Sequence, residues 1–250
     1  SKVIEPVLQK NGGDIYYINI SQDHFKLGGS SFSQILNTIG NDAPNVKNPA
    51  FVKNVFNTIQ QLIKEEQIVA GHDVASGGLI TTLLELCFAD TNLGAELDIT
   101  ALAEKDSFKV LFSENTGIVF QAKDASIETI LSEANIEFFN LGKVSESDTL
   151  SIINYTEVFT MTISRLRDVW YTTSFLLDQK QTANNLAEAR YNNYKNQPLK
   201  YTFPKHFTGK LPVLDASKPR PKAAILREKG SNSEREMANA MYLAGFDVKD

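Results

Sequence analysis

Residues 71–79, which read GHDVASGGL, constrain the fold of this chain more than any other stretch. The apolar residues 68–70 precede them and suit a short strand, and the apolar run 79–89 that follows suits a buried helix. Two adjacent glycines stand where the strand would pass into the helix, so the backbone can turn tightly there. The pattern predicts a strand–turn–helix junction.

Two interpretations of this junction remain open from the spacing alone. The N–H groups of Gly77 and Gly78 would lie at the start of a helix, where unpaired donors and the helix dipole favour an anion such as phosphate. Asp73 beside them could then hold a Mg²⁺ ion that accompanies the phosphate. The other interpretation is a plain tight turn in which the glycines only let strand and helix approach closely.

Composition excludes several classes of protein. The chain has 250 residues, enough for one or two domains, and 42% hydrophobic with 22% charged residues is ordinary for a soluble globular protein. A net charge of −5 argues against a broad nucleic-acid surface. No apolar run approaches the roughly 20 residues of a membrane span, and the N-terminus lacks a signal-peptide pattern. Because Cys87 is the single cysteine, no internal disulfide is possible, and we expect a cytoplasmic location.

Strands and helices alternate through residues 1–177, which predicts an α/β (α+β) domain: a mixed sheet covered by helices, which we expect on one face. The expected strands are 14–20, 68–72, 95–99, 118–122, 137–144 and a hairpin over 150–161. The expected helices are 32–39, 50–66, 79–89, 127–134 and one that starts at 164. The apolar run 108–112 is expected as a further strand, separated from the strand 118–122 by a turn at 114–117.

The remaining residues divide into two parts. Residues 178–220 are polar and contain four prolines, which is typical of a linker. Residues 221–226 suit a strand and 237–244 a helix, with Ser233 and Glu236 as a capping box. This strand and helix would open a further α/β domain, and we expect the sequence to be a piece of a longer polypeptide.

Three other polar positions have ordinary structural interpretations. A histidine at a strand end, as His72 is, more often makes structural hydrogen bonds than performs catalysis. Glu114 and Asn115 fall in a turn between apolar segments, and we expect that turn to be solvated. The glycine pair at 28–29 could open a second anion-binding helix start, but a glycine-rich loop with Ser30 as a helix cap is the more ordinary interpretation.

Five motifs, in order, carry a resemblance to a known family. Residues 72–79 (HDVASGGL), followed by LLELCFA at 83–89, resemble the HD-x-S-D-G-G-L segment of the phosphoribosylformylglycinamidine synthases of the large, fused type. The other matching segments are LGGS at 27–30, LFSENTG at 111–117, RDVWYTTS at 167–174 and PKAAILREKGSNS at 221–233. The resemblance covers nearly the whole chain.

The resemblance implies an enzyme of purine biosynthesis. The family converts formylglycinamide ribonucleotide, ATP and glutamine to the amidine, ADP, phosphate and glutamate, and we expect the full-length enzyme to be a cytoplasmic monomer. Residues 1–177 would be the C-terminal subdomain of the aminoimidazole-ribonucleotide-synthetase-like fold in its second synthase half. Residues 178–220 would be the linker, and 221–250 the first βα unit of a class I glutaminase domain.

The same resemblance implies a site. In the family, the HD-x-S loop belongs to a site for ATP or ADP and Mg²⁺ that is considered structural, so no catalytic residue is assigned here. Asp73 would bind Mg²⁺, and Ala75, Ser76, Gly77 and Gly78 would bind the nucleotide. Ala75 stands where the family usually has serine and Ser76 where it has aspartate, so a side-chain contact to the nucleotide is lost at 75.

Two alternatives stay open at this stage. The chain could be a non-catalytic α/β scaffold or interaction module, or a related ATP-binding synthetase that has no glutaminase, such as aminoimidazole ribonucleotide synthetase or selenophosphate synthetase. The glutaminase-like segment 221–233 argues against the second. The family's glutaminase nucleophile lies downstream of the matching segment and Cys87 lies in the wrong domain, so we expect this chain alone to be inactive.

Overall fold

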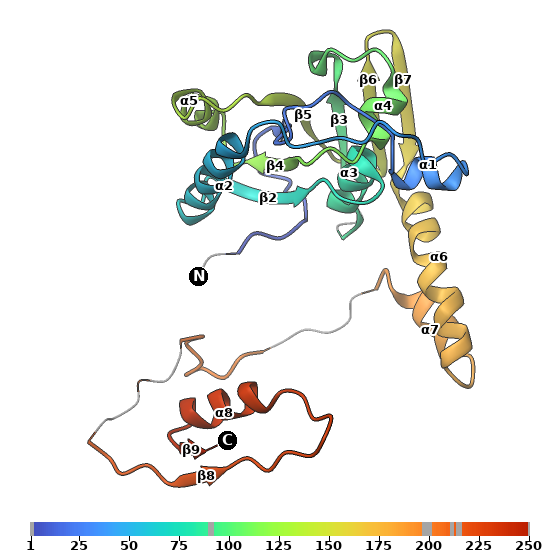
Figure 1. The fold of residues 1–250 in the computed structure, drawn as a ribbon. Coiled ribbons are helices and arrows are strands. Elements are labelled where there is room, and N and C mark those ends of the chain that lie inside the picture. The colour runs from blue at the N-terminus through green and yellow to red at the C-terminus, as the bar shows by residue number, and fades with distance from the viewer. Residues whose placement is uncertain (1–2, 90–92, 197–201, 211–212, 214–216, 250) are drawn as a thin grey trace. The chain divides into compact units, whose positions relative to one another are not determined.

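The computed structural model describes residues 3–89, 93–196, 202–210, 213 and 217–249, and it divides the chain into two compact units, residues 1–197 and 198–250 (Figure 1). The first unit is built on a seven-stranded sheet of order β2-β4-β1-β5-β3-β6-β7. Only the β3–β6 pair is parallel, so the sheet is mixed as the sequence predicts. The strands are β1 (Ile15–Ile18), β2 (Ile68–Asp73), β3 (Gly94–Asp98), β4 (Ile118–Ala122), β5 (Phe139–Ser145), β6 (Thr149–Asn154) and β7 (Glu157–Thr162).

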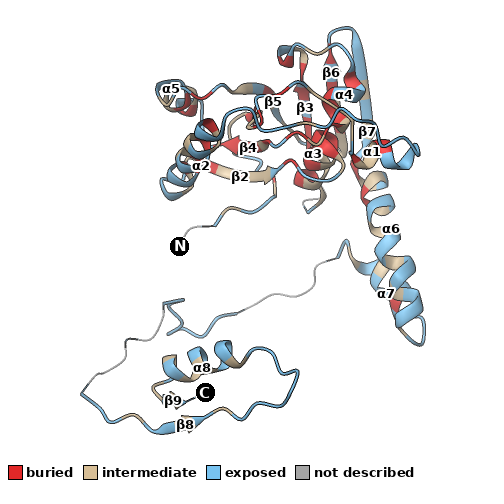
Figure 2. Cartoon of the chain, in the orientation of Figure 1, coloured by how far each residue is buried: buried red, intermediate tan, exposed pale blue. Residues whose placement is uncertain are grey.

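Helices cover both faces of this sheet, so the expectation of helices on one face is wrong. Alternate residues of β1 enter two separate cores: Ile15 and Tyr17 pack with α3 and α4, whereas Tyr16 and Ile18 pack with α2 and α5. The reason is visible in the sequence of β1, which is apolar at every position and is therefore buried on both sides. β4 is likewise buried along most of its length (Figure 2). The helices of this unit are α1 (Ser31–Ile35), α2 (Pro49–Lys64), α3 (Gly78–Phe88), α4 (Ser107–Phe112), α5 (Ser126–Glu133), α6 (Ile163–Gln181) and α7 (Leu186–Asn193).

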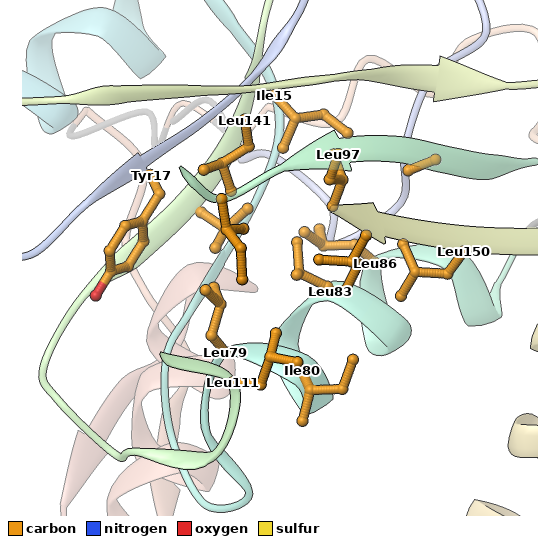
Figure 3. Close-up of a cluster of buried hydrophobic side chains, with 14 of the residues drawn as sticks. Ile15, Tyr17, Leu79, Ile80, Leu83, Leu86, Leu97, Leu111, Leu141 and Leu150 are labelled. Atoms are coloured by element: carbon orange, nitrogen blue, oxygen red, sulfur yellow. The ribbon is translucent and has the colours of Figure 1, made fainter. Parts of the chain in front are cut away.

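The larger core surrounds α3. Side chains of α3 point toward β3, β6 and their neighbours in the sheet (Figure 3). Burial in this core raises the pKa of the Cys87 thiol to about 12, so the thiol is an inert core group as a lone mid-helix cysteine suggests. The prediction that α3 is buried on more than one side is therefore confirmed. The residues of this larger core that Figure 3 labels include Tyr17, Leu79, Leu83, Leu86, Leu97, Leu141 and Leu150.

Two helices differ from the sequence expectation. The apolar run at 108–112, expected as a strand, belongs to the helix α4, whose first N–H groups are capped by the Asp106 carboxylate. α1 ends at Ile35 instead of continuing to residue 39, and Ile35 and Ile39 are 80% and 67% exposed. Their helical spacing therefore does not bury an apolar face in this unit.

The segment expected as a linker from residue 178 begins inside a helix. α6 continues to Gln181, and α7 folds back against it through stacked ring pairs, Tyr171 with Tyr194 at 4.0 Å and Phe175 with Tyr191 at 4.4 Å between centroids. The aromatic residues in a polar stretch are what allow this packing. The first unit consequently extends to residue 197, and parts of the expected linker (197–201, 211–212 and 214–216) lie outside the described residues.

The second unit contains one strand–helix–strand element. β8 (Lys222–Ala224) pairs in parallel with β9 (Asp247–Lys249), and α8 (Glu234–Leu243) connects them. The expected strand and helix are present, but the expected capping box is wrong, because Ser233 has φ +75° and its side chain makes no cap hydrogen bond. None of the helices in the described part of the chain is long and apolar enough to cross a membrane.

Candidate functional site

The glycine pair at the start of α3 has a structural requirement. Gly77 and Gly78 have φ +90° and +75°, in the left-handed region where glycine is favoured. A Cβ atom on Gly78 would lie 2.7 Å from the carbonyl oxygen of Ser113 and 2.8 Å from that of Leu111. The tight turn predicted from the sequence is therefore real, and it lets α3 start against the backbone between α4 and β4.

A single carboxylate lies where three of the sequence motifs meet. Glu114 Oε1 accepts hydrogen bonds from the backbone N–H of Gly77 and from that of Ser31, each at 2.8 Å. Burial alone would raise the pKa of Glu114, but the donors from Ser31 and Gly77 outweigh it and lower the pKa below its usual value. Glu114 is therefore an ionised, internally bonded group, and the expectation of a solvated turn is wrong.

The next residue confirms that this turn is part of the interior. Asn115 is buried, and its Nδ2 atom donates to Ser21 Oγ and to the carbonyl oxygen of His24, each at 3.0 Å. These bonds tie the 111–117 turn to the segment that leads into the glycine pair at 28–29. The sequence offers no local signal for such contacts, because the partners lie more than 90 residues apart.

A buried aspartate, Asp23, fixes the segment that leads into the glycine pair at 28–29. Asp23 lies 3.1 Å from Lys26 Nζ and 3.4 Å from Lys47 Nζ, and it accepts backbone hydrogen bonds from His24 and Asn45. Burial opposes ionisation of Asp23, but the bond from Lys26 and the two backbone donors lower its pKa to about 2. Asp23 was not among the residues singled out from the sequence, since an isolated aspartate in a polar segment carries no signal.

The glycine N–H groups that were expected to bind phosphate already donate hydrogen bonds within the chain. Gly77 N–H donates to Glu114, and Gly78 N–H donates to the carbonyl oxygen of Ala75 at 3.0 Å. Ala75 and Ser76 are exposed at the tip of the loop, and their N–H groups donate to no other group within the described ranges. The N–H groups of the two glycines are therefore occupied, and those of Ala75 and Ser76 at the tip are open to an anion.

Asp73 stands beside the tip with a solvent-exposed carboxylate, 79% accessible. Among the residues that the structure describes, no three His, Cys, Asp or Glu side chains gather as a metal cluster. Mg²⁺ is commonly held by one or two carboxylates together with substrate phosphates and water. Asp73 fits that kind of site as a single ligand and does not fit a site made of protein ligands alone.

His72 is held by structural contacts, as expected. Its Nε2 atom lies 3.2 Å from Glu85 Oε2, and Nδ1 lies 2.7 Å from the carbonyl oxygen of Asp73. Glu85 in turn accepts a hydrogen bond from Trp170 Nε1 at 3.1 Å. These residues border a cavity of about 460 Å³ between α3 and α6, which the sequence did not predict.

The comparison with known families now identifies the domain. Residues 15–153 match the family described as AIR synthase related protein, C-terminal domain. The chain belongs to this family. The matched range contains the 71–79 junction, the 111–117 turn and the segment around Asp23, so the site lies wholly within the AIR synthase related domain. The expected fold is thereby confirmed, whereas the glutaminase assignment of 221–250 stays a prediction.

Curated relatives of this AIR synthase related chain carry the name expected from the motifs. A probable phosphoribosylformylglycinamidine synthase, chloroplastic/mitochondrial, of Arabidopsis thaliana is 32% identical over 260 residues, covering 100% of this chain and 18% of the relative. The phosphoribosylformylglycinamidine synthase of Homo sapiens is 32% identical over 246 residues, covering 95% of this chain and 18% of the relative. The chain therefore spans less than a fifth of these relatives, and its resemblance to them is confirmed.

Solved structures agree on the fold. The structure described as T. maritima PurL complexed with ATP has a TM-score of 0.51 and 14% identity, covering 66% of this chain and 27% of that chain. The corresponding complex with FGAR has a TM-score of 0.51 and 16% identity, covering 66% and 29%. At these identities the likeness concerns the fold alone.

Proposed function

We propose that this chain is part of a phosphoribosylformylglycinamidine synthase, the ligase that uses ATP and glutamine to convert formylglycinamide ribonucleotide to its amidine. The observation that carries the proposal is the match along the whole chain to relatives of that name, at 32% identity. Because the match includes residues 178–250, it favours this synthase over related synthetases without a glutaminase. The activity belongs to the whole protein, and residues 221–250 are the beginning of the glutaminase part of that protein.

Within that protein, the 73–76 tip forms one wall of a site for ATP or ADP. The N–H groups of Ala75 and Ser76, with the Ser76 hydroxyl, bind phosphate oxygens, and the hydroxyl at 76 compensates for the one missing at 75. Support for nucleotide binding comes from the T. maritima PurL structure that is described as a complex with ATP. A cytoplasmic, monomeric enzyme remains our expectation for the whole protein.

Asp73 contributes one ligand to Mg²⁺ in this proposal. The ion, when bound, neutralises phosphate charge. The chain's own part is to hold the Asp73 carboxylate at the end of β2, where the carbonyl oxygen of Asp73 accepts a hydrogen bond from Thr82 Oγ1 at 3.1 Å. That bond fixes the backbone at residue 73 to α3 while the carboxylate faces solvent.

Replacement of Asp73 by alanine tests this role. We expect Asp73→Ala to weaken binding of Mg²⁺-ADP to the whole protein by about tenfold, or ~1.4 kcal/mol, because a charged metal ligand is lost. Isothermal titration calorimetry with Mg²⁺-ADP measures the change. Asp98→Ala is a matched control, since Asp98 is also an exposed aspartate at the end of a strand, and it should leave the affinity unaltered. Equal affinities for wild type and Asp73→Ala would refute the metal role.

A further inference from the structure

We propose that Glu114 is the positioning residue of the nucleotide loop: it holds the start of α3 so that phosphate binds at the loop tip instead of the helix start. This inference rests on the proposed function. Glu114 is outside the 71–79 loop and acts through the backbone of Gly77, so it need not touch the nucleotide itself.

The 114–117 turn holds both ends of the loop tip. On the upstream side, the N–H of Val74 donates to the carbonyl oxygen of Gly117 at 2.9 Å. On the downstream side, the N–H of Gly77 donates to Glu114 Oε1 at 2.8 Å. Only Ala75 and Ser76 lie between these two attachment points, so the position of their N–H groups is set by the turn. A loop fixed at both ends presents its donors without losing further conformational entropy when a ligand binds.

Glu114 also occupies the electrostatically favourable position at the start of α3. An ionised acceptor of backbone N–H groups makes stronger hydrogen bonds than a neutral acceptor, and its charge complements the helix dipole. A phosphate at the same place would meet the carboxylate as a like charge and would have to displace it from Gly77. The free donors of Ala75 and Ser76 are therefore the favoured contacts for phosphate.

The same oxygen atom joins a second segment to the loop. Ser31, which follows the glycine pair at 28–29, donates its N–H to Glu114 Oε1 at 2.8 Å. One carboxylate therefore links the 111–117 turn to the 71–79 junction and to the residue that directly follows the 27–30 motif. Any change that moves the carboxylate should move the loop, whereas a change that keeps an oxygen in place should not.

Three substitutions of Glu114 distinguish the effect of the position of its carboxylate from the effect of its charge. Glu114→Gln keeps the length of the side chain and an acceptor oxygen, so Mg²⁺-ADP affinity of the whole protein should stay within about threefold of wild type. Glu114→Asp keeps the charge but withdraws the carboxylate by about one C–C bond, roughly 1.5 Å, and should weaken binding about tenfold. Glu114→Ala should weaken it at least as much. If Glu114→Ala does not fold, the Asp and Gln variants decide the question.

A matched control separates positioning from general loss of stability. Asn48 caps α2 by accepting the N–H groups of Ala50 and Phe51, so Asn48→Ala also removes two backbone hydrogen bonds but lies outside the site. It should lower the melting temperature like Glu114→Ala and leave the Mg²⁺-ADP affinity unchanged. Wild-type affinity in Glu114→Asp, alongside weakened binding in Asp73→Ala, would overturn the role of Glu114 alone. Wild-type affinity in Asp73→Ala would overturn only the metal role proposed above. No measurable binding of Mg²⁺-ADP to the wild-type protein would overturn the proposed nucleotide site and the role of Glu114 with it.

Discussion

Gly78→Ala should lower the free energy of unfolding of the first unit by about 2–5 kcal/mol. Two costs combine. A non-glycine residue at φ +75° costs roughly 1–2 kcal/mol, and an extra methyl group forced into a packed site costs about 1–3 kcal/mol. The methyl carbon would lie 2.7–2.8 Å from backbone atoms of Ser113, Leu111 and Phe112, which cannot rotate away as a side chain could.

Gly29→Ala isolates the first of these costs. Gly29 has φ +77°, nearly the value of Gly78, but a Cβ atom there would have no neighbour within 4 Å. The substitution should therefore cost only about 1–2 kcal/mol. Urea unfolding of the 250-residue chain, followed by fluorescence of its single tryptophan, measures both variants. Trp170 is a suitable probe because its ring lies 5.8 Å from that of Phe88 at the end of α3. Equal losses in the two variants would show that close approach to α4 is not what requires glycine at 78.

The elements that the sequence predicted well are those with strong local patterns. The helix 50–66 and the apolar helix 79–89 correspond closely to α2 and α3, and the hairpin 150–161 corresponds to β6 and β7. In each case the pattern of buried residues along the chain determines the element type. The apolar sequence of β1, Ile15–Ile18, also indicated burial on both faces, and considering it would have predicted helices on both sides of the sheet.

The errors arose where distant contacts decide the structure. Polar composition at 178–196 suggested a linker, but α7 is stabilised by rings of Tyr191 and Tyr194 stacked on α6. α1 was expected to continue to Ile39 from spacing alone, yet Ile35, Leu36 and Ile39 are all exposed in this unit. Periodicity describes what a helix could bury and does not say whether a surface exists to receive it.

The structure brings together segments that the motif order had singled out, while the site residues predicted there stay a prediction. Residues of the 71–79 junction and of the 111–117 turn are in contact, and the segment around 27–31 joins them. The bond between Glu114 and Gly77 spans 37 residues, and that between Glu114 and Ser31 spans 83, so neither is readable from a local pattern. Without them, the start of α3 resembles an open anion site. With them, the N–H of Gly77 is occupied by the chain's own carboxylate and the loop tip becomes the place to test.

The second large effect on stability is expected at Asp23, the buried carboxylate that fixes the segment before the 27–30 turn. Asp23→Asn should lower the free energy of unfolding at pH 7 by about 2–3 kcal/mol, because one acceptor oxygen is replaced by an NH₂ group. In the wild-type chain, Asp23 Oδ1 accepts from the N–H of His24 and Oδ2 from that of Asn45. An asparagine can satisfy only one of these donors and loses the charge that pairs with Lys26.

Asp42→Asn is the matched control for this variant. Asp42 also pairs with Lys26, at 3.2 Å, but its side chain is 81% exposed. Exposed pairs contribute little, so this variant should lose less than about 1 kcal/mol. A loss in Asp42→Asn as large as that in Asp23→Asn would show that the charge of Lys26, and not the buried carboxylate, is what matters.

The pH dependence of the difference in unfolding free energy between wild type and Asp23→Asn gives a separate test. The pKa of Asp23 in the folded chain is about 2, below its usual value of 3.8, so the unfolded chain binds more protons at pH values near and between these two. The stability that comes from ionised Asp23 is therefore fully present above about pH 5 and is lost as the pH falls toward 2. We expect the difference in unfolding free energy between wild type and Asp23→Asn to be constant from pH 7 to about 5 and to shrink by about 1 kcal/mol at pH 3. Urea unfolding at each pH measures it. A difference that stays constant down to pH 3 would mean that Asp23 stabilises the fold through its shape and not through its charge.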